Sequence, residues 1–350
     1  MERKDVTLSC PLPLGRHTTV QLAHGGGGRL MRELLEQLVL PAFANDALAA
    51  RHDSAVVVLG GARLAFTTDT YVVAPRVFPG GDIGSLAVTG TVNDLAMAGG
   101  RPACLSVGLV IEEGLPVDEL RAAIDSMRET AARCGIAIVT GDTKVVDRGK
   151  GDGLFVNTAG IGLVPEGVDV RPARVRPGDA IIVSGDVGRH GIAVLSQREG
   201  LAFETPIASD CAPLWPLVEA LIAAGVEIHC LRDPTRGGLA TALNEIALDG
   251  GVAIEVEEAA IPVHDAVAVA CELLGLDPLY VACEGRLVAF VAPDDAEGAL
   301  KALRDHPLGR GAAVIGRVTE GASGLVTLRT RLGGGRLLDL LSGEQLPRIC

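Results

Sequence analysis

The sequence predicts a mixed α+β protein of two domains, and three observations support this. The chain has 350 residues, more than a single hydrophobic core usually supports. Hydrophobic residues make up 48% of it, which is ample for two cores. Both halves interleave β-rich runs with helical patterns, and a segment punctuated by proline and glycine, residues 171–178, separates them. We therefore expect an N-terminal domain over 20–170 and a C-terminal domain over 171–336.

The N-terminal half begins with an extension over 1–19, which has two prolines, a glycine and no clear period, and we expect it to be flexible. A glycine cluster then leads into a helical pattern over 29–39. The later runs predict strands at 55–59, 64–68, 104–111, 136–140 and 154–164, and helices at 83–98 and 117–133.

The C-terminal half also alternates predicted strands and helices. Its runs predict strands at 180–184, 226–231, 252–256, 286–291 and 313–318, and helices at 213–224, 236–249, 264–274 and 294–305. The last residues, 337–350, show neither a helical nor a strand period of apolar residues. Gly343 and Pro347 also discourage regular structure. We expect a mobile tail that ends in Cys350.

Composition excludes several classes of function. The formal net charge of −13 repels phosphate backbones, so we expect no nucleic-acid partner. No apolar run reaches the roughly 18 residues of a membrane span, and the charged start leads into no secretory signal. The eight cysteines form no C-x-x-C pair, which argues against a zinc ribbon. We expect a protein of the reducing cytoplasm.

Acidic residues recur beside small or β-rich segments along the chain. They are Asp53, Asp69, Asp94, Asp142 and Asp233. Carboxylates at strand ends are good Mg²⁺ ligands, and Mg²⁺ bridges nucleotide phosphates. A single aspartate in a turn is more often a cap, but five such positions favour a metal–nucleotide site.

A glycine loop, Gly25–Gly28, precedes the first helical pattern. Its backbone N–H groups could face a phosphate, although a flexible loop without a ligand fits the same sequence. No G-x-x-x-x-G-K-S/T string exists, so a P-loop is excluded.

Lys144 and Glu284 are candidates for chemistry at the substrate. Glu284 sits between two apolar runs, where burial would raise its pKa and suit it to act as a base. The alternative is a turn residue that faces water. Lys144 follows Gly141-Asp142-Thr143 directly.

Cys350, the final residue, is the most distinctive feature. The tail is no prenylation signal, because the fourth residue from the end is Pro347. A thiolate is a strong nucleophile, so the tail could carry an acyl-type group.

Six motifs together carry a family resemblance over about residues 20–350. They are AHGGGG at 23–28, FPGGDIG at 78–84, TVNDLA at 91–96, GDTKVV at 141–146, DPTRGG at 233–238 and the terminal PRIC at 347–350. This set resembles the HypE family of hydrogenase maturation factors, in the PurM-like superfamily of aminoimidazole ribonucleotide and selenophosphate synthetases.

The resemblance implies a two-domain PurM-like fold in which the N-terminal sheets pair across a homodimer, with ATP and Mg²⁺ near that interface. The substrate would be the tail itself. A HypF-like carbamoyltransferase would load Cys350, and ATP-dependent dehydration would turn the S-carbamoyl group into a thiocyanate. The cyanide would pass to iron on a HypC–HypD-like scaffold, for a nickel–iron hydrogenase. An inward tail would serve dehydration and an outward tail would serve loading and delivery.

The resemblance also assigns residues to roles. Lys144 and Glu284 would face the carbamoyl group, with Glu284 as proton acceptor. Nucleotide contacts would come from Gly25, Gly26, Gly27, Gly28, Asp69, Asn93, Asp94, Asp142 and Thr143. The Mg²⁺ ligands would be Asp53, Asp69, Asp94 and Asp233.

Two alternatives stay open on the sequence. The chain could act on a free small molecule, as selenophosphate synthetase or thiamine-phosphate kinase does, but the terminal cysteine would then have no purpose. It could also be a carrier whose tail holds a partner covalently, against which the aspartate set and the Lys144–Glu284 pair argue.

Overall fold

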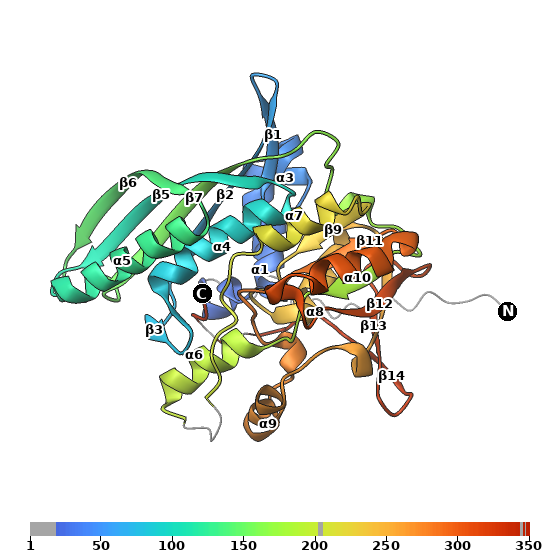
Figure 1. The fold of residues 1–350 in the computed structure, drawn as a ribbon. Coiled ribbons are helices and arrows are strands. Elements are labelled where there is room, and N and C mark those ends of the chain that lie inside the picture. Colours follow the sequence, from blue (N-terminus) through green and yellow to red (C-terminus); the bar gives the residue numbers. More distant parts are fainter. Residues whose placement is uncertain (1–18, 202–205, 344–345, 347) are drawn as a thin grey trace.

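A computed structural model of the chain describes residues 19–201, 206–343, 346 and 348–350. The predicted flexible extension therefore lies outside the described residues, except for Thr19. Figure 1 shows two mixed α/β halves side by side, with the carboxy terminus between them. The predicted two-domain α+β fold is confirmed.

The N-terminal sheet has five strands in the order β1-β2-β7-β5-β6. Their bounds are β1 Ala55–Leu59, β2 Ala62–Tyr71, β5 Arg101–Glu112, β6 Ala137–Val146 and β7 Leu154–Leu163. All neighbours are antiparallel except β5 and β6, which α5 (Val117–Arg133) connects. Each of these strands overlaps a predicted one. The strand expected to end at Thr140 continues to Val146, so the GDTK motif lies within β6.

Helix α4 (Ile83–Met97) is the shared core of the two domains. Asp82 caps its start by accepting hydrogen bonds from the N–H groups of Gly84 and Ser85. All residues of α4 except Ser85 and Asp94 are buried. One side packs in the N-terminal core, while Ala96 and Met97 join the core of the C-terminal domain. A helix enclosed in this way holds Asp94 in a fixed position.

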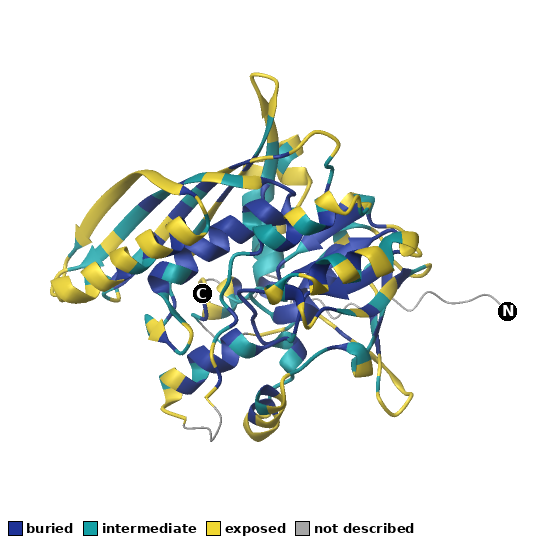
Figure 2. Cartoon of the chain, in the orientation of Figure 1, coloured by how far each residue is buried: buried dark blue, intermediate teal, exposed yellow. Residues whose placement is uncertain are grey.

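The other face of the N-terminal sheet is uncovered. Along β2 and β7 the side chains alternate, so that Phe66, Asn157 and Ile161 point outwards. Every residue of β6 except Val146 is exposed, as Figure 2 shows at the edge of the sheet. Val139 is 62% exposed there.

The C-terminal sheet has seven strands in the order β14-β13-β10-β12-β8-β11-β9. Their bounds are β8 Ala180–Val183, β9 Ile228–Arg232, β10 Ala253–Glu257, β11 Val288–Val291, β12 Ala313–Thr319, β13 Val326–Arg329 and β14 Gly335–Leu337. One core lies under helices α7 (Trp215–Ala223) and α10 (Ala296–Arg304). A second core lies on the opposite face, under α8 (Gly238–Asp249).

Several elements complete the chain. A continuous helix comprises α1 (Arg29–Leu34), a π-helical stretch (Leu35–Val39) and α2 (Leu40–Ala42). The other short helices and strands are α3 Asp46–Ala49, β3 Val77–Phe78, β4 Gly81–Asp82, and the 3-10 turns Leu22–Gly25, Pro172–Arg174, Glu258–Ala260, Pro278–Tyr280, Pro293–Asp295 and Pro307–Gly309.

Helices α6 (Arg189–Glu199) and α9 (Asp265–Leu274) pack together beside the tail. The sequence patterns predicted α9 but not α6. Both Gly188 and Gly191 sit near the start of α6, and its buried residues surround the helix axis, so no clear stripe marks it. Within the described residues, no helix is long and apolar enough to cross a membrane.

Candidate active site

An acidic cavity of about 290 Å³ lies at the junction of the two domains. Its acidic lining includes Asp53, Asp69, Asp94, Asp233, Glu245 and Glu284. Asp53 precedes β1, Asp69 lies on β2 and Asp94 on α4, whereas Asp233 follows β9. Residues far apart in sequence thus meet because the start of β1, the end of β2, helix α4 and the end of β9 all reach this junction.

Three contacts position the acids. The Thr67 hydroxyl lies 2.9 Å from Oδ2 of Asp94. The guanidinium of Arg232 pairs with Oδ1 of Asp53 at 2.6 Å and approaches Glu245 at 3.5 Å. Oδ2 of Asp53 and Oε1 of Glu284 are buried and have no hydrogen-bond partner among the described residues. These two oxygens are free to meet a ligand.

Burial makes the carboxylates hard to ionise together. It raises the pKa of Asp53 to about 6, against the nearby charge of Arg232. Burial, and then repulsion from neighbouring acids, raises the pKa of Asp94, Asp233 and Glu284 well above the usual range. A cation in the cavity would relieve this repulsion.

The end of the chain occupies the same cavity. Cys350 is 8% exposed and lines both the acidic cavity and an adjoining one of about 50 Å³. The tail runs antiparallel to residues 72–74, with the N–H of Val72 donating to a carboxylate oxygen of Cys350, the last residue, at 3.0 Å. The N–H of Ala74 donates to the Arg348 carbonyl at 3.3 Å.

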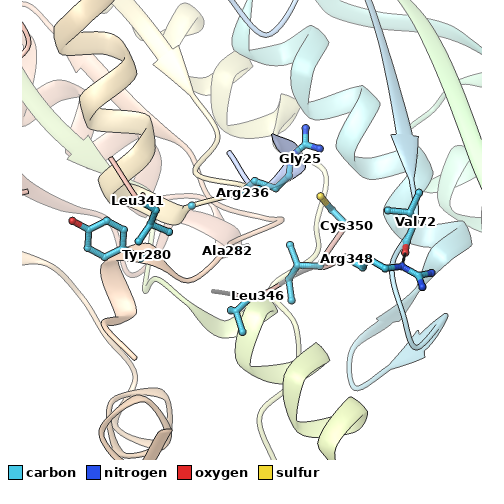
Figure 3. A pocket seen from close by; sticks show the side chains of 12 residues that line it. Gly25, Val72, Arg236, Tyr280, Ala282, Leu341, Leu346, Arg348 and Cys350 are labelled. Atoms are coloured by element: carbon cyan, nitrogen blue, oxygen red, sulfur yellow. Dashed lines mark hydrogen bonds between the residues drawn. The ribbon is translucent and has the colours of Figure 1, made fainter. Parts of the chain in front are cut away.

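Arg348 anchors this arrangement. Its Nε donates to the Val72 carbonyl at 2.9 Å, its guanidinium pairs with Asp152, and it lies 6.0 Å from the ring centroid of Phe155. In Figure 3 the Arg348 side chain extends towards Val72, while the Cys350 sulfur points towards the side of Arg236. The two side chains of the tail therefore face opposite directions.

Arg236 lines both cavities together with Cys350. Its interaction with Cys350 is the main reason that the pKa of Arg236 is raised. Burial raises the pKa of the Cys350 thiol to about 12, and Arg236 opposes this shift. No other described residue forms a hydrogen bond or ion pair with the Arg236 guanidinium, so it can bind an anion.

The comparisons with known proteins identify the family. A model described as AIR synthase related protein, N-terminal domain, matches residues 51–164, and its C-terminal counterpart matches 176–329. The carbamoyl dehydratase HypE of Azotobacter vinelandii is 51% identical over 335 residues, which cover 96% of this chain and 98% of that protein. The chain belongs to the HypE family of carbamoyl dehydratases.

Solved structures agree with this assignment. A HypE structure in complex with ATP superposes with a TM-score of 0.80 at 49% identity, covering 95% of this chain and 100% of that one. The HypE of a HypE–HypF complex gives a TM-score of 0.84 at 46% identity, covering 88% and 99%. The predicted PurM-like fold and the predicted activity, a carbamoyl dehydratase of hydrogenase maturation, are confirmed.

The structure brings most of the expected HypE site residues together. Those that line the acidic cavity are Cys350, Glu284, Asp53, Asp69, Asp94, Asp233 and Gly27. Gly25 and Gly26 line the smaller cavity beside Cys350. Gly28 instead lies against the Leu341 carbonyl, where a Cβ would come within 2.5 Å of the oxygen.

Asn93 does not line either cavity. Its amide donates to the carbonyls of Ala212 and Glu284, at 3.1 and 3.3 Å, and accepts from the N–H of Leu214 at 2.8 Å. It is fully buried, and these bonds tie α4 to the segment that carries Glu284. Within one chain, Asn93 therefore supports the position of Glu284.

Asp142, Thr143 and Lys144 also lie away from the cavity. All three are exposed on β6, and the Lys144 ammonium pairs with the Asp142 carboxylate at 2.5 Å. The single chain does not bring them to Cys350. Conversely, sequence reasoning passed over Arg236, although it lies inside the DPTRGG motif between Asp233 and the glycines. The signal that could have identified Arg236 is its place in the same motif as the candidate metal ligand Asp233.

Proposed function

We propose that this chain dehydrates a carbamoyl group carried on the Cys350 sulfur, using ATP, to give a thiocyanate, ADP and phosphate. The carbonyl oxygen of the thiocarbamate accepts the γ-phosphoryl group as the nitrogen loses its first proton, which gives an imidate phosphate. Loss of the second nitrogen-bound proton then expels this oxygen as phosphate. The C–N bond becomes a triple bond, and the S–C bond is kept. One observation carries the proposal: Cys350 lies in the cavity that gathers Glu284 and the four aspartates.

Glu284 is the proposed proton acceptor. It is 3% exposed, and its Oε1 is unpartnered among the described residues, so it can receive a hydrogen bond from the carbamoyl nitrogen. Burial raises its pKa, which makes the ionised carboxylate a stronger base than one in water. Arg236, on the sulfur side, would pair with the oxygen as it gains negative charge.

The aspartates fit a Mg²⁺ ion by their chemistry. Hard carboxylate oxygens are suitable ligands, and the repulsion among Asp53, Asp94 and Asp233 calls for a cation. No three acidic, histidine or cysteine side chains of the described chain already form a metal cluster, so phosphate oxygens would complete the set. When bound, Mg²⁺ with Asp53, Asp69, Asp94 and Asp233 would neutralise phosphate charge.

A homodimer would complete the site. The uncovered face of the N-terminal sheet carries apolar side chains such as Val110, Phe66 and Ile161, which a second copy would bury. Thr68 belongs to this face and also lines the acidic cavity. A partner sheet would thus border the cavity, and its β6 would supply Lys144, Asp142 and Thr143.

Loading and delivery need the tail outside. With a pKa of about 12, the buried Cys350 thiol is almost entirely protonated near neutral pH and is a poor nucleophile. A HypF-like carbamoyltransferase would therefore load the tail in an outward state, and a HypC–HypD-like scaffold would receive cyanide from it. The cysteines of the described residues are free thiols, which fits the reducing cytoplasm.

The test is the mass of the C-terminal peptide. The full-length chain, carbamoylated on Cys350, is mixed with Mg²⁺ and ATP, and the peptide mass is followed with time. We expect the loss of one water, together with release of ADP and phosphate. Cys350→Ala should bind ATP, but it should show neither the loss of water from the tail nor the release of ADP and phosphate. ATP turnover with no change in the tail mass would contradict the proposal and favour a free substrate.

A further inference from the structure

Helix α6 contacts the tail through two side chains that bind its backbone. The Nε2 of His190 lies 2.8 Å from the Ile349 carbonyl oxygen. Two turns later, Arg198 donates to the Arg348 carbonyl at 2.8 Å and to the Ala74 carbonyl at 2.7 Å. Neither contact involves a tail side chain, so these two residues of α6 bind the main chain of the tail.

His190 is held on every side. It has no exposed surface, its Nδ1 lies 2.9 Å from the Ser209 hydroxyl, and the Phe78 ring meets its ring edge-on at a centroid distance of 5.2 Å. Ser209 is itself fixed, because its hydroxyl oxygen accepts the N–H of Cys211 at 3.0 Å. The imidazole thus has one orientation.

The hydrogen bonds also define the tautomer. A carbonyl oxygen can only accept, so Nε2 carries the hydrogen and donates it to Ile349. Nδ1 then accepts the hydroxyl hydrogen of Ser209. Burial lowers the pKa of His190, which keeps this neutral form at neutral pH.

The main chain on both sides of the Cys350 Cα is therefore held. His190 holds the Ile349 carbonyl, and the Val72 N–H holds a carboxylate oxygen of Cys350. What remains free is the rotation of the cysteine side chain itself. This fixation matters for reactivity, because a displacement of about 1 Å at a reacting group can slow a reaction by a hundredfold.

We propose that His190, oriented by Ser209, is a positioning residue for the dehydration: it sets the place of the Cys350 sulfur in the acidic cavity through the Ile349 carbonyl. The inference rests on the proposed function and assigns that reaction a residue that neither the acidic cluster nor the terminal motif contains. His190 touches no atom that reacts.

Two polar substitutions test it in the full-length carbamoylated chain. In His190→Gln the amide nitrogen can reach the position of Nε2 and bind Ile349. In His190→Asn the shorter amide can reach only the position of Nδ1 and bind Ser209. Ser196→Ala is the matched control, because Ser196 is a buried polar residue of the same helix whose hydroxyl, among the described residues, bonds only the Ala193 carbonyl of α6.

The readout is the single-turnover rate of water loss at saturating ATP. We expect His190→Asn to be slower by roughly tenfold or more, and His190→Gln and Ser196→Ala to stay within roughly threefold of the parent chain. In the unloaded chain, iodoacetamide should alkylate Cys350 faster in His190→Asn, since its tail spends more time outside.

Equal rates for the asparagine and glutamine variants, or unchanged alkylation, would overturn the inference. If either variant folds poorly, the alkylation of Cys350 is compared in Ser209→Ala and Ser196→Ala instead. The inference predicts that Cys350 is alkylated faster in Ser209→Ala. Failure of the parent chain to lose water would instead refute the proposed function, so the two failures are distinguishable.

Discussion

The backbone N–H of Arg29 donates a hydrogen bond to the carbonyl of Leu341, 2.8 Å away. The first turn of α1 thus holds the start of the tail, directly after the glycine loop. Further anchors are the buried Leu338, whose carbonyl accepts from Asn244, and the Asp339 carbonyl, which accepts from Tyr280. The tail is therefore tethered at 338–341 and docked again at its last three residues.

Gly28→Ala should weaken the first of these anchors. A Cβ there would meet the Leu341 carbonyl oxygen at 2.5 Å, so tail or helix must shift. We expect a loss of about 1–3 kcal/mol in the free energy of unfolding without nucleotide, measured by denaturant titration. Gly25→Ala is the control, because a Cβ there meets nothing within 4 Å. Equal stability of the two variants would refute this role of Gly28.

Glu284→Gln should separate stability from activity. Since the folded pKa of Glu284 is raised, its ionisation at neutral pH opposes folding, and this cost appears as pH rises above about 4.3. The neutral amide removes the cost. We expect an unchanged or higher Tm at pH 7, with the rate of water loss lower by about 10²–10⁴-fold. A fully active variant would exclude Glu284 as the base.

Alkaline pH should release the tail. The thiol pKa is about 12 when docked, whereas a free cysteine has about 8.5. Docking is therefore strongest below pH 8.5 and weakens as pH rises from there towards 12. Hydrogen exchange of the C-terminal peptide between pH 8 and 10, compared with Cys350→Ser, measures this. The C-terminal peptide of Cys350→Ser should not show the increase in exchange with pH that the parent chain shows. The same pH dependence in both chains would argue against a buried thiol.

Mixed dimers should reveal where Lys144 acts. Chains with Lys144→Ala keep Cys350, and chains with Cys350→Ala keep Lys144, so each homodimer should fail to form thiocyanate. If the lysine of one copy serves the cavity of the other, co-expressed mixed dimers should regain activity on the intact tail. Mass analysis of dimers purified through two different tags provides the measurement. Inactive mixed dimers would place Lys144 in the site of its own chain, and an active Lys144→Ala homodimer would place it outside catalysis.

The sequence by itself determined the regular elements and the chemistry. Apolar alternation marked β2 and β7, helical spacing marked α5, and the terminal Cys350 with its motifs pointed to the reaction. These signals are local, because they depend on side chains a few residues apart. For the same reason α6 was missed, since its burial by several neighbours leaves no one-sided stripe.

Only the tertiary structure decided which candidates meet. Glu284 and Asp94 come from different domains, yet they share one cavity with Cys350, whereas Lys144 lies on an exposed strand. His190 and Arg236 gained their importance from contacts with a tail more than a hundred residues away. Such proximity depends on how the sheets and α4 pack together, and no spacing along the chain encodes it.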